Sequence, residues 1–237
     1  MPPQPLLKIC PAAGISFTPE SVIQRPEVAA WIGQCIACWG WVETQTSRLF
    51  THLLDLNVED GMELYNSFVG ASLKENGIKI LARSKLPRRS FELIEALLKV
   101  INSHQKTRDK ISHWYWGISD QIPDGLVLID PKQILIRAAR IRDIEERGER
   151  PTASDYRYPV DLIRVYRVQD LQVDAKSFIE LAQLINKCAR LCFKMESQQL
   201  SQLHDELSSD GRLAERLNPL HSIASPSKRA RHEQTRK

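Results

Sequence analysis

The sequence lacks the features that mark membrane, secreted and disordered proteins. Its most apolar stretch, residues 28–56, is interrupted by residues such as Gln34, Glu43 and Arg48, so we expect no membrane span of about 20 apolar residues. The first five residues, MPPQP, have no basic start followed by an apolar core, so we expect no signal peptide. With 42% hydrophobic residues, 26% charged residues and only 10 glycines, the composition is that of a globular protein.

The cysteine content does not indicate a disulfide framework. There are five cysteines, an odd number, in a chain large enough to form a core without covalent cross-links. We therefore expect reduced thiols and a cytoplasmic location.

Excess charge is confined to the C-terminal end. The net charge is +4, and the last twelve residues hold five basic residues against one acid, which accounts for the whole excess. The remainder of the chain is neutral, so global charge gives no reason to expect a nucleic-acid-binding body. The tract Lys228–Arg229–Ala230–Arg231 resembles a nuclear-import or nucleic-acid-binding tract, although a solubilising tail explains it equally well.

Most of the chain has the three- and four-residue apolar spacing of amphipathic helices. We predict helices starting near Pro26 and continuing past Leu53, over residues 59–83 with a break at Gly70, over residues 88–113, over residues 131–147, and from a cap at Asp174 to about residue 192. The first helix contains three tryptophans within eleven residues, which predicts a large contact surface.

Two shorter patterns predict strands. Aromatic residues at 114–116, a Pro-Asp-Gly turn at 123–125 and an apolar run at 126–129 predict a β-hairpin. Residues 163–168 alternate and predict a further strand. We therefore predict a mainly α protein, an up-and-down helical bundle with a small β-hairpin insertion and a disordered C-terminal tail. The expected parts are an N-terminal arm (1–24), a helical domain (25–207) and a basic tail (208–237).

The chemically suggestive segment is Arg108-Asp109-Lys110-Ile111-Ser112-His113, at the end of the third predicted helical region. Arginine is a permanent, fork-shaped cation suited to phosphate, and histidine transfers protons near neutral pH. Together they suffice to cleave a phosphodiester without a metal or other cofactor. On a straight helix, positions five apart point about 140° away from each other. We therefore expect Arg108 and His113 to converge only where the helix ends or is distorted, whereas Asp109 and His113 share a face.

This motif resembles that of the HEPN family (higher-eukaryote and prokaryote nucleotide-binding domains), over about residues 27–116. The resemblance lies in a polar residue after the arginine, a histidine near a helix end, and a long first helix carrying an acid, Glu43. It implies a metal-independent ribonuclease of a toxin–antitoxin, phage-defence or RNA-processing system. It also implies a homodimer in which two motifs line one cleft, an antitoxin-like protein partner, and Arg108, Asp109 and His113 as catalytic residues. The family usually has asparagine where this chain has Asp109. The resemblance therefore supports the fold more strongly than it supports catalytic activity.

Five basic residues between the second and third helical regions form a candidate RNA-binding patch: Lys79, Arg83, Lys85, Arg88 and Arg89. A solvated turn explains the same run, and we consider it the better explanation. Trp114, Tyr115 and Trp116 could stack on bases, but core packing of the two tryptophans is the simpler interpretation. His104, one turn before Arg108, is a second candidate for proton transfer, although a surface position is the simpler expectation.

A metal site is the least favoured interpretation. Cys35 and Cys38, together with Cys188 and Cys192, could form a four-thiolate zinc site, but their apolar neighbours favour small buried side chains and no metal. The main alternative to an RNA-binding protein or ribonuclease is a non-catalytic interaction or regulatory protein that binds a protein partner.

Overall fold

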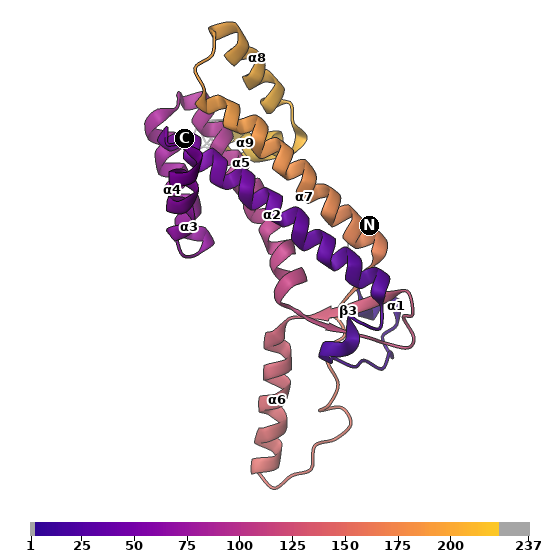
Figure 1. Ribbon diagram of the computed structural model, residues 1–237. Helices are drawn as coiled ribbons and strands as arrows, with labels where there is room; N and C mark the ends of the chain where they lie inside the picture. The colour runs from indigo at the N-terminus through magenta and orange to yellow at the C-terminus, as the bar shows by residue number, and fades with distance from the viewer. Residues whose placement is uncertain (1–2, 223–237) are drawn as a thin grey trace, which may run out of the picture. The chain divides into compact units, whose positions relative to one another are not determined.

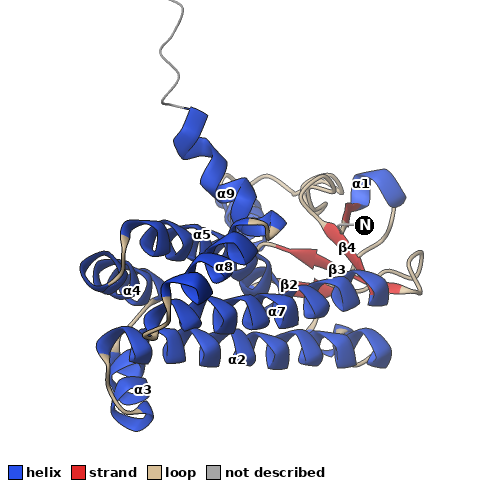
Figure 2. Cartoon of the chain, turned by 90° about the horizontal axis from the view of Figure 1, so that it is seen from above, coloured by secondary structure: helices blue, strands red, loops and turns tan. Residues whose placement is uncertain are grey.

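The computed structural model describes residues 3–222, which are mostly helical (Figures 1 and 2). The strands of this part form a single antiparallel sheet in the order β1-β4-β3-β2. The prediction of a mainly α protein with a small β insertion is therefore confirmed. No helix within residues 3–222 is both long enough and apolar enough to cross a membrane.

The three longest helices are α2 (Pro26–Leu54), α5 (Arg88–His113) and α7 (Val168–Ala189). The described part of the chain divides into two units, one containing residues 3–43 and 104–182, the other residues 44–103 and 183–222. The first residues of α2 and α7 belong to unit 1 and their last residues to unit 2. The first residues of α5 belong to unit 2 and its last residues to unit 1. The predicted starts of α2 and α5, each at or next to a proline, agree with the structure.

Unit 2 also contains several shorter helices. They are α3 (Val58–Ser67), α4 (Ala71–Lys85), a 3-10 turn (Arg190–Cys192), α8 (Ser197–Ser208) and α9 (Gly211–Ser222). The predicted break at Gly70 is confirmed, because its φ of 91° is a left-handed conformation that favours glycine. Phe50 lies 5.5 Å from Tyr65 and 5.6 Å from Phe68 between ring centroids, so α2 and α3 share one apolar cluster.

The sheet belongs to unit 1. Its strands are β1 (Gln4–Pro5), β2 (Tyr115–Gly117), β3 (Gly125–Ile129) and β4 (Arg164–Arg167). The β2–β3 pair is the predicted hairpin, in which Trp116 is opposite Leu128. Short helices α1 (Leu6–Ile9) and α6 (Pro131–Glu146), with a 3-10 turn (Pro19–Ser21), complete the unit. One core cluster joins α1, the sheet and the loops beside it: Leu6, Ile122, Val127, Ile129, Ile163 and Val165.

The N-terminal arm predicted over residues 1–24 is attached to this sheet. Its β1 strand pairs with β4, and Ser16 exchanges two backbone hydrogen bonds with Ile118. A Cβ atom at Gly117 would lie 2.6 Å from the Phe17 ring and 2.7 Å from the Ser16 carbonyl oxygen. Glycine is therefore needed where the arm crosses the hairpin.

Two predicted boundaries were wrong. The last long helix begins at Val168, six residues before the expected cap at Asp174, because β4 runs directly into α7. The Asp170 carboxylate accepts from the Arg167 backbone N–H at 2.9 Å and caps the helix there. Residues 208–222 of the predicted disordered tail include α9. Its remaining residues, 223–237, with the basic tract, lie outside the described part of the chain.

Candidate functional site

The segment Arg108–His113 forms the last turns of α5, in unit 1. The Arg108 Nη1 atom lies 3.4 Å from His113 Nε2 and 3.1 Å from Asp109 Oδ1. The three side chains therefore form one connected group. His113 is exposed, and the Arg108 and Asp109 side chains are 27% and 44% exposed. An external ligand can reach all three.

The contact between Arg108 and His113 defines their hydrogen-bonding roles. A guanidinium group has only donors, so Nε2 of His113 is the acceptor and carries no proton when this bond forms. The lone pair on Nε2 is the feature that a general base needs. Arg108 places a permanent positive charge directly beside that base, where it can stabilise a phosphate.

The expected geometry is observed. Arg108 and His113 were expected to converge only where the helix ends or is distorted, and α5 ends at His113. Asp109 bonds to Arg108, so its carboxylate acts on the histidine through the arginine.

A pocket of about 570 Å³ lies on another face of the same helix end. Thr107, Lys110 and Trp114 of α5 line it, and Arg108 and His113 do not. The Lys110 ammonium lies 5.4 Å from the centroid of the Trp114 ring. The rest of the lining comes from Pro3, from Leu128 of β3, and from residues of β4 and α7, including Arg164, Tyr166, Asp170 and Asp174.

Sequence reasoning missed the carboxylates of this pocket. Asp174 lies half-buried within α7, and its Oδ2 atom has no hydrogen-bond partner among the described residues. Burial, followed by the nearby charge of Asp170, raises the pKa of Asp174 from 3.8 to about 6. Burial and the same two carboxylates raise the pKa of Tyr166. The four-residue spacing of Asp170 and Asp174 on one helix was the signal that could have identified this pair.

The predicted basic patch belongs to unit 2, and most of its charge is already balanced. Lys79 pairs with Glu95, Arg88 with Glu92 and Arg89 with Asp205. The Lys79 hydrogen bond is the main reason that the pKa of Glu95 is lowered. Arg83 lies over the Phe91 ring at 5.4 Å, and Lys85 is exposed. These ion pairs are what a solvated turn between two helices would form.

Trp114 and Trp116, for which core packing was the simpler expectation, are both half-buried. Trp116 packs 5.5 Å from Tyr166 and donates to the Ile111 carbonyl oxygen at 3.1 Å, whereas Tyr115 is exposed. His104 is half-buried and lies 6.2 Å from the Phe178 ring centroid. Of the residues named for proton transfer, His113 is therefore the more accessible.

No family model, curated protein or solved structure matches this chain. The geometry of its own residues therefore carries the functional argument.

Cys35, Cys38 and Cys188 are buried, and Cys192 is half-buried. Cys35 and Cys38 belong to unit 1, whereas Cys188 and Cys192 belong to unit 2. Burial raises the pKa of Cys35 and of Cys188 to about 12, and that of Cys192 to about 11. Within residues 3–222, no three His, Cys, Asp or Glu side chains are grouped to hold a metal ion. A raised pKa makes Cys35, Cys188 and Cys192 poor nucleophiles at neutral pH.

Proposed function

We propose that this protein is a HEPN-like, metal-independent endoribonuclease whose catalytic residues are Arg108, Asp109 and His113. The observation that supports the proposal is the 3.4 Å contact between Arg108 Nη1 and His113 Nε2 on the exposed end of α5. It places a permanent cation for the phosphate beside an imidazole nitrogen that can act as a base.

The proposed reaction needs only these groups and the RNA. His113 takes the proton of a ribose 2′-hydroxyl, and the 2′-oxygen attacks the adjacent phosphorus. The bond from phosphorus to the 5′-oxygen of the next nucleotide breaks, leaving a 2′,3′-cyclic phosphate and a 5′-hydroxyl. Arg108 stabilises the negative charge on the phosphate in the transition state, and Asp109 positions Arg108.

The proton required by the leaving 5′-oxygen comes from a second acid. In the proposed homodimer, His113 of the partner subunit supplies it, so that two motifs serve one cleft. The resemblance to the HEPN family also supports a cytoplasmic toxin–antitoxin or defence role. In that role, an antitoxin-like protein blocks the exposed end of α5.

Induced expression tests the proposal in cells. We expect growth arrest and fragmented RNA with the wild-type protein, and neither with His113→Ala. Lys106→Ala is the matched control, since Lys106 is an exposed cation on the same helix, outside the motif. Healthy growth and intact RNA with folded, expressed wild-type protein would refute the toxic ribonuclease and favour a binding protein.

A further inference from the structure

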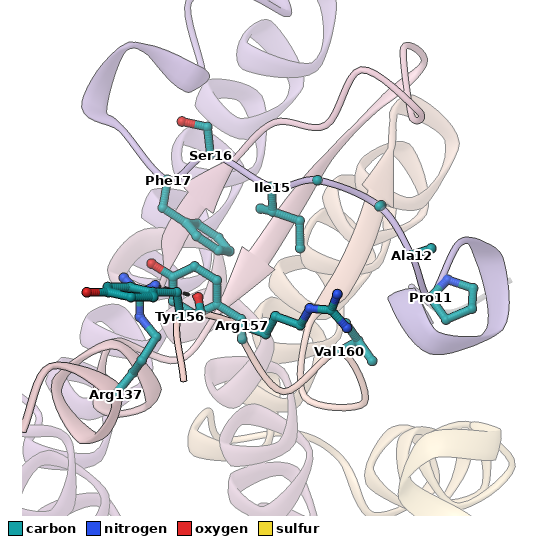
Figure 3. Close-up of a pocket in the computed structure, with 12 residues that line it drawn as sticks. Pro11, Ala12, Ile15, Ser16, Phe17, Arg137, Tyr156, Arg157 and Val160 are labelled. Atoms are coloured by element: carbon teal, nitrogen blue, oxygen red, sulfur yellow. Dashed lines mark hydrogen bonds between the residues drawn. The ribbon is translucent and has the colours of Figure 1, made fainter. Parts of the chain in front are cut away.

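A second pocket of about 570 Å³ lies in unit 1, between the N-terminal arm and the loop that follows α6 (Figure 3). This volume is within the range that holds a small-molecule ligand. The arm contributes residues 11–17, and the other wall consists of Arg137, Tyr156, Arg157, Tyr158 and Val160. The motif residues Arg108 and His113 do not line it.

One arginine of this pocket is held rigidly. Arg137 Nη1 donates to the Tyr156 carbonyl oxygen at 2.8 Å, and its guanidinium carbon lies 3.9 Å from the Tyr158 ring centroid. Tyr158 packs edge-to-face with Phe17, with ring centroids 4.9 Å apart. The Arg137 Nε atom is buried and has no hydrogen-bond partner among the described residues. The cation is thus oriented before any ligand arrives.

A second arginine and a tyrosine are exposed at the same pocket. Tyr156 is 50% exposed, and Arg157 forms no ion pair within residues 3–222. In Figure 3, Phe17, Arg137 and Tyr156 lie on one side of the pocket, and the Arg157 side chain extends towards Val160 on the other. The pocket thus offers aromatic rings at one end and an unpaired guanidinium at the other.

The charge of the pocket favours a negatively charged ligand. Its lining includes two arginines and no acidic residue among the described residues. The neighbouring carboxylate, Asp155, is bound by Arg140 at 2.8 Å and by the backbone and hydroxyl of Thr152. Because the Asp155 carboxylate is bound by Arg140 and Thr152, it does not neutralise Arg137 or Arg157. The positive charge of both pocket arginines is therefore available to an anion.

We propose that this pocket binds a small aromatic anion, a planar ring that bears a phosphate or carboxylate. The ring packs against Phe17 and Tyr156, and the anionic group pairs with Arg157, while Arg137 adds a fixed positive charge. The site is independent of the proposed RNA cleavage, because it shares no residue with the motif on α5.

Calorimetric titration of the full-length protein tests this site. The probes are the four ribonucleoside monophosphates and indole-3-acetate, which separate a nucleotide from an aromatic carboxylate. Adenosine and inorganic phosphate are the controls for the ring and for the anion alone. We expect at least one aromatic anion to bind, and Arg157→Gln and Tyr156→Ser each to weaken it by about tenfold.

Arg142→Gln is the matched variant, since Arg142 is an exposed arginine of α6 that does not line the pocket. We expect it to bind as the wild type does. Both pocket substitutions change exposed side chains, and thermal melting checks that each variant is folded. The proposal is overturned if no aromatic anion binds at about 1 mM, the upper end for a specific ligand. Unchanged affinity in both pocket variants, or adenosine or phosphate binding as tightly as the best anion, also overturns it.

Discussion

Arg108 donates a hydrogen bond to Nε2 of His113, five residues later on the same helix, over 3.4 Å. The same Nη1 atom contacts Asp109, so one guanidinium group joins an acid and a base on the surface of α5. Because a guanidinium group only donates, His113 accepts this bond through Nε2. Arg108 therefore holds together the carboxylate and the imidazole of the motif.

This role of Arg108 predicts the result of replacing it by lysine. Lysine keeps the charge but has no planar fork, so it cannot bind Asp109 and a phosphate in the same way. We expect Arg108→Lys to lower the RNA cleavage rate by about 10- to 100-fold, and Arg108→Ala by more. The measurement is single-turnover cleavage of a labelled RNA, with Lys106→Ala as the control. Full activity in Arg108→Ala would remove the arginine from the mechanism.

A buried bond in unit 2 predicts destabilisation by acid. His204 Nε2 lies 2.8 Å from the Ser90 hydroxyl oxygen, and both residues are buried. Burial, with a further contribution from Arg89, lowers the pKa of His204 below its ordinary value of 6.5, while Asp205 opposes the shift. A lowered pKa means that the folded state resists protonation. Its stabilising effect is complete above about pH 6.5 and is lost as the pH falls through the folded-state value.

We therefore expect the melting temperature of the wild type to fall by a few degrees relative to that of His204→Gln between pH 7.5 and pH 5.5, since Asp174 is present in both proteins. Thermal melts at a series of pH values measure the difference. If both proteins lost the same stability over this range, His204 would not be the responsible group.

The raised pKa of Asp174 predicts that its contribution to stability changes with pH in the direction opposite to that of His204. Its pKa is raised from 3.8 to about 6, so the folded protein favours the protonated carboxyl. The favourable contribution is complete below about pH 3.8 and is lost as the pH rises through 6. At pH 7.5 the charged, half-buried carboxylate destabilises unit 1.

We expect Asp174→Asn to increase the free energy of unfolding at pH 7.5 by on the order of 1 kcal/mol, after allowance for solvent screening. At pH 4 the gain should nearly vanish. Urea denaturation at both pH values measures it. A variant less stable than the wild type at pH 7.5 would show that the Asp174 carboxylate makes a favourable interaction.

Gly61 predicts a steric effect. It is buried on α3, and a Cβ atom there would overlap the side chain of Thr51 on α2. We expect Gly61→Ala to destabilise the protein by about 1–3 kcal/mol. Gly33→Ala is the matched control, because Gly33 is exposed on α2 with open space around its Cα, and alanine should be neutral or stabilising there by up to about 1 kcal/mol. Equal stability of the two variants would contradict the close packing of α2 and α3.

Sequence patterns predicted the parts of the fold that depend only on residues close together in the chain. The start of α2 at Pro26 follows from the fit of proline to a first helical turn, and the break at Gly70 from its left-handed backbone. The hairpin followed from a turn between two apolar runs. The start of α7 was missed because the chain passes from β4 into the helix without a loop, and Asp170 rather than Asp174 caps it.

The functional geometry was harder to predict because it depends on where a helix ends and on distant contacts. A helical wheel separates Arg108 from His113, and the two side chains meet where α5 ends at His113. Phe17 and Tyr158 are 141 positions apart in the chain, and no local pattern indicates that they meet. The pocket beside them therefore emerges only from the folded chain.

Cleavage of a labelled RNA by the purified protein, in the presence of a metal chelator, tests the central claim most directly. The account predicts that the wild type and Lys106→Ala leave 2′,3′-cyclic phosphate ends, and that His113→Ala is slower by about 10²- to 10⁴-fold. Equal cleavage by wild type and His113→Ala would identify a contaminating nuclease, and no cleavage by folded wild type would contradict the proposed activity.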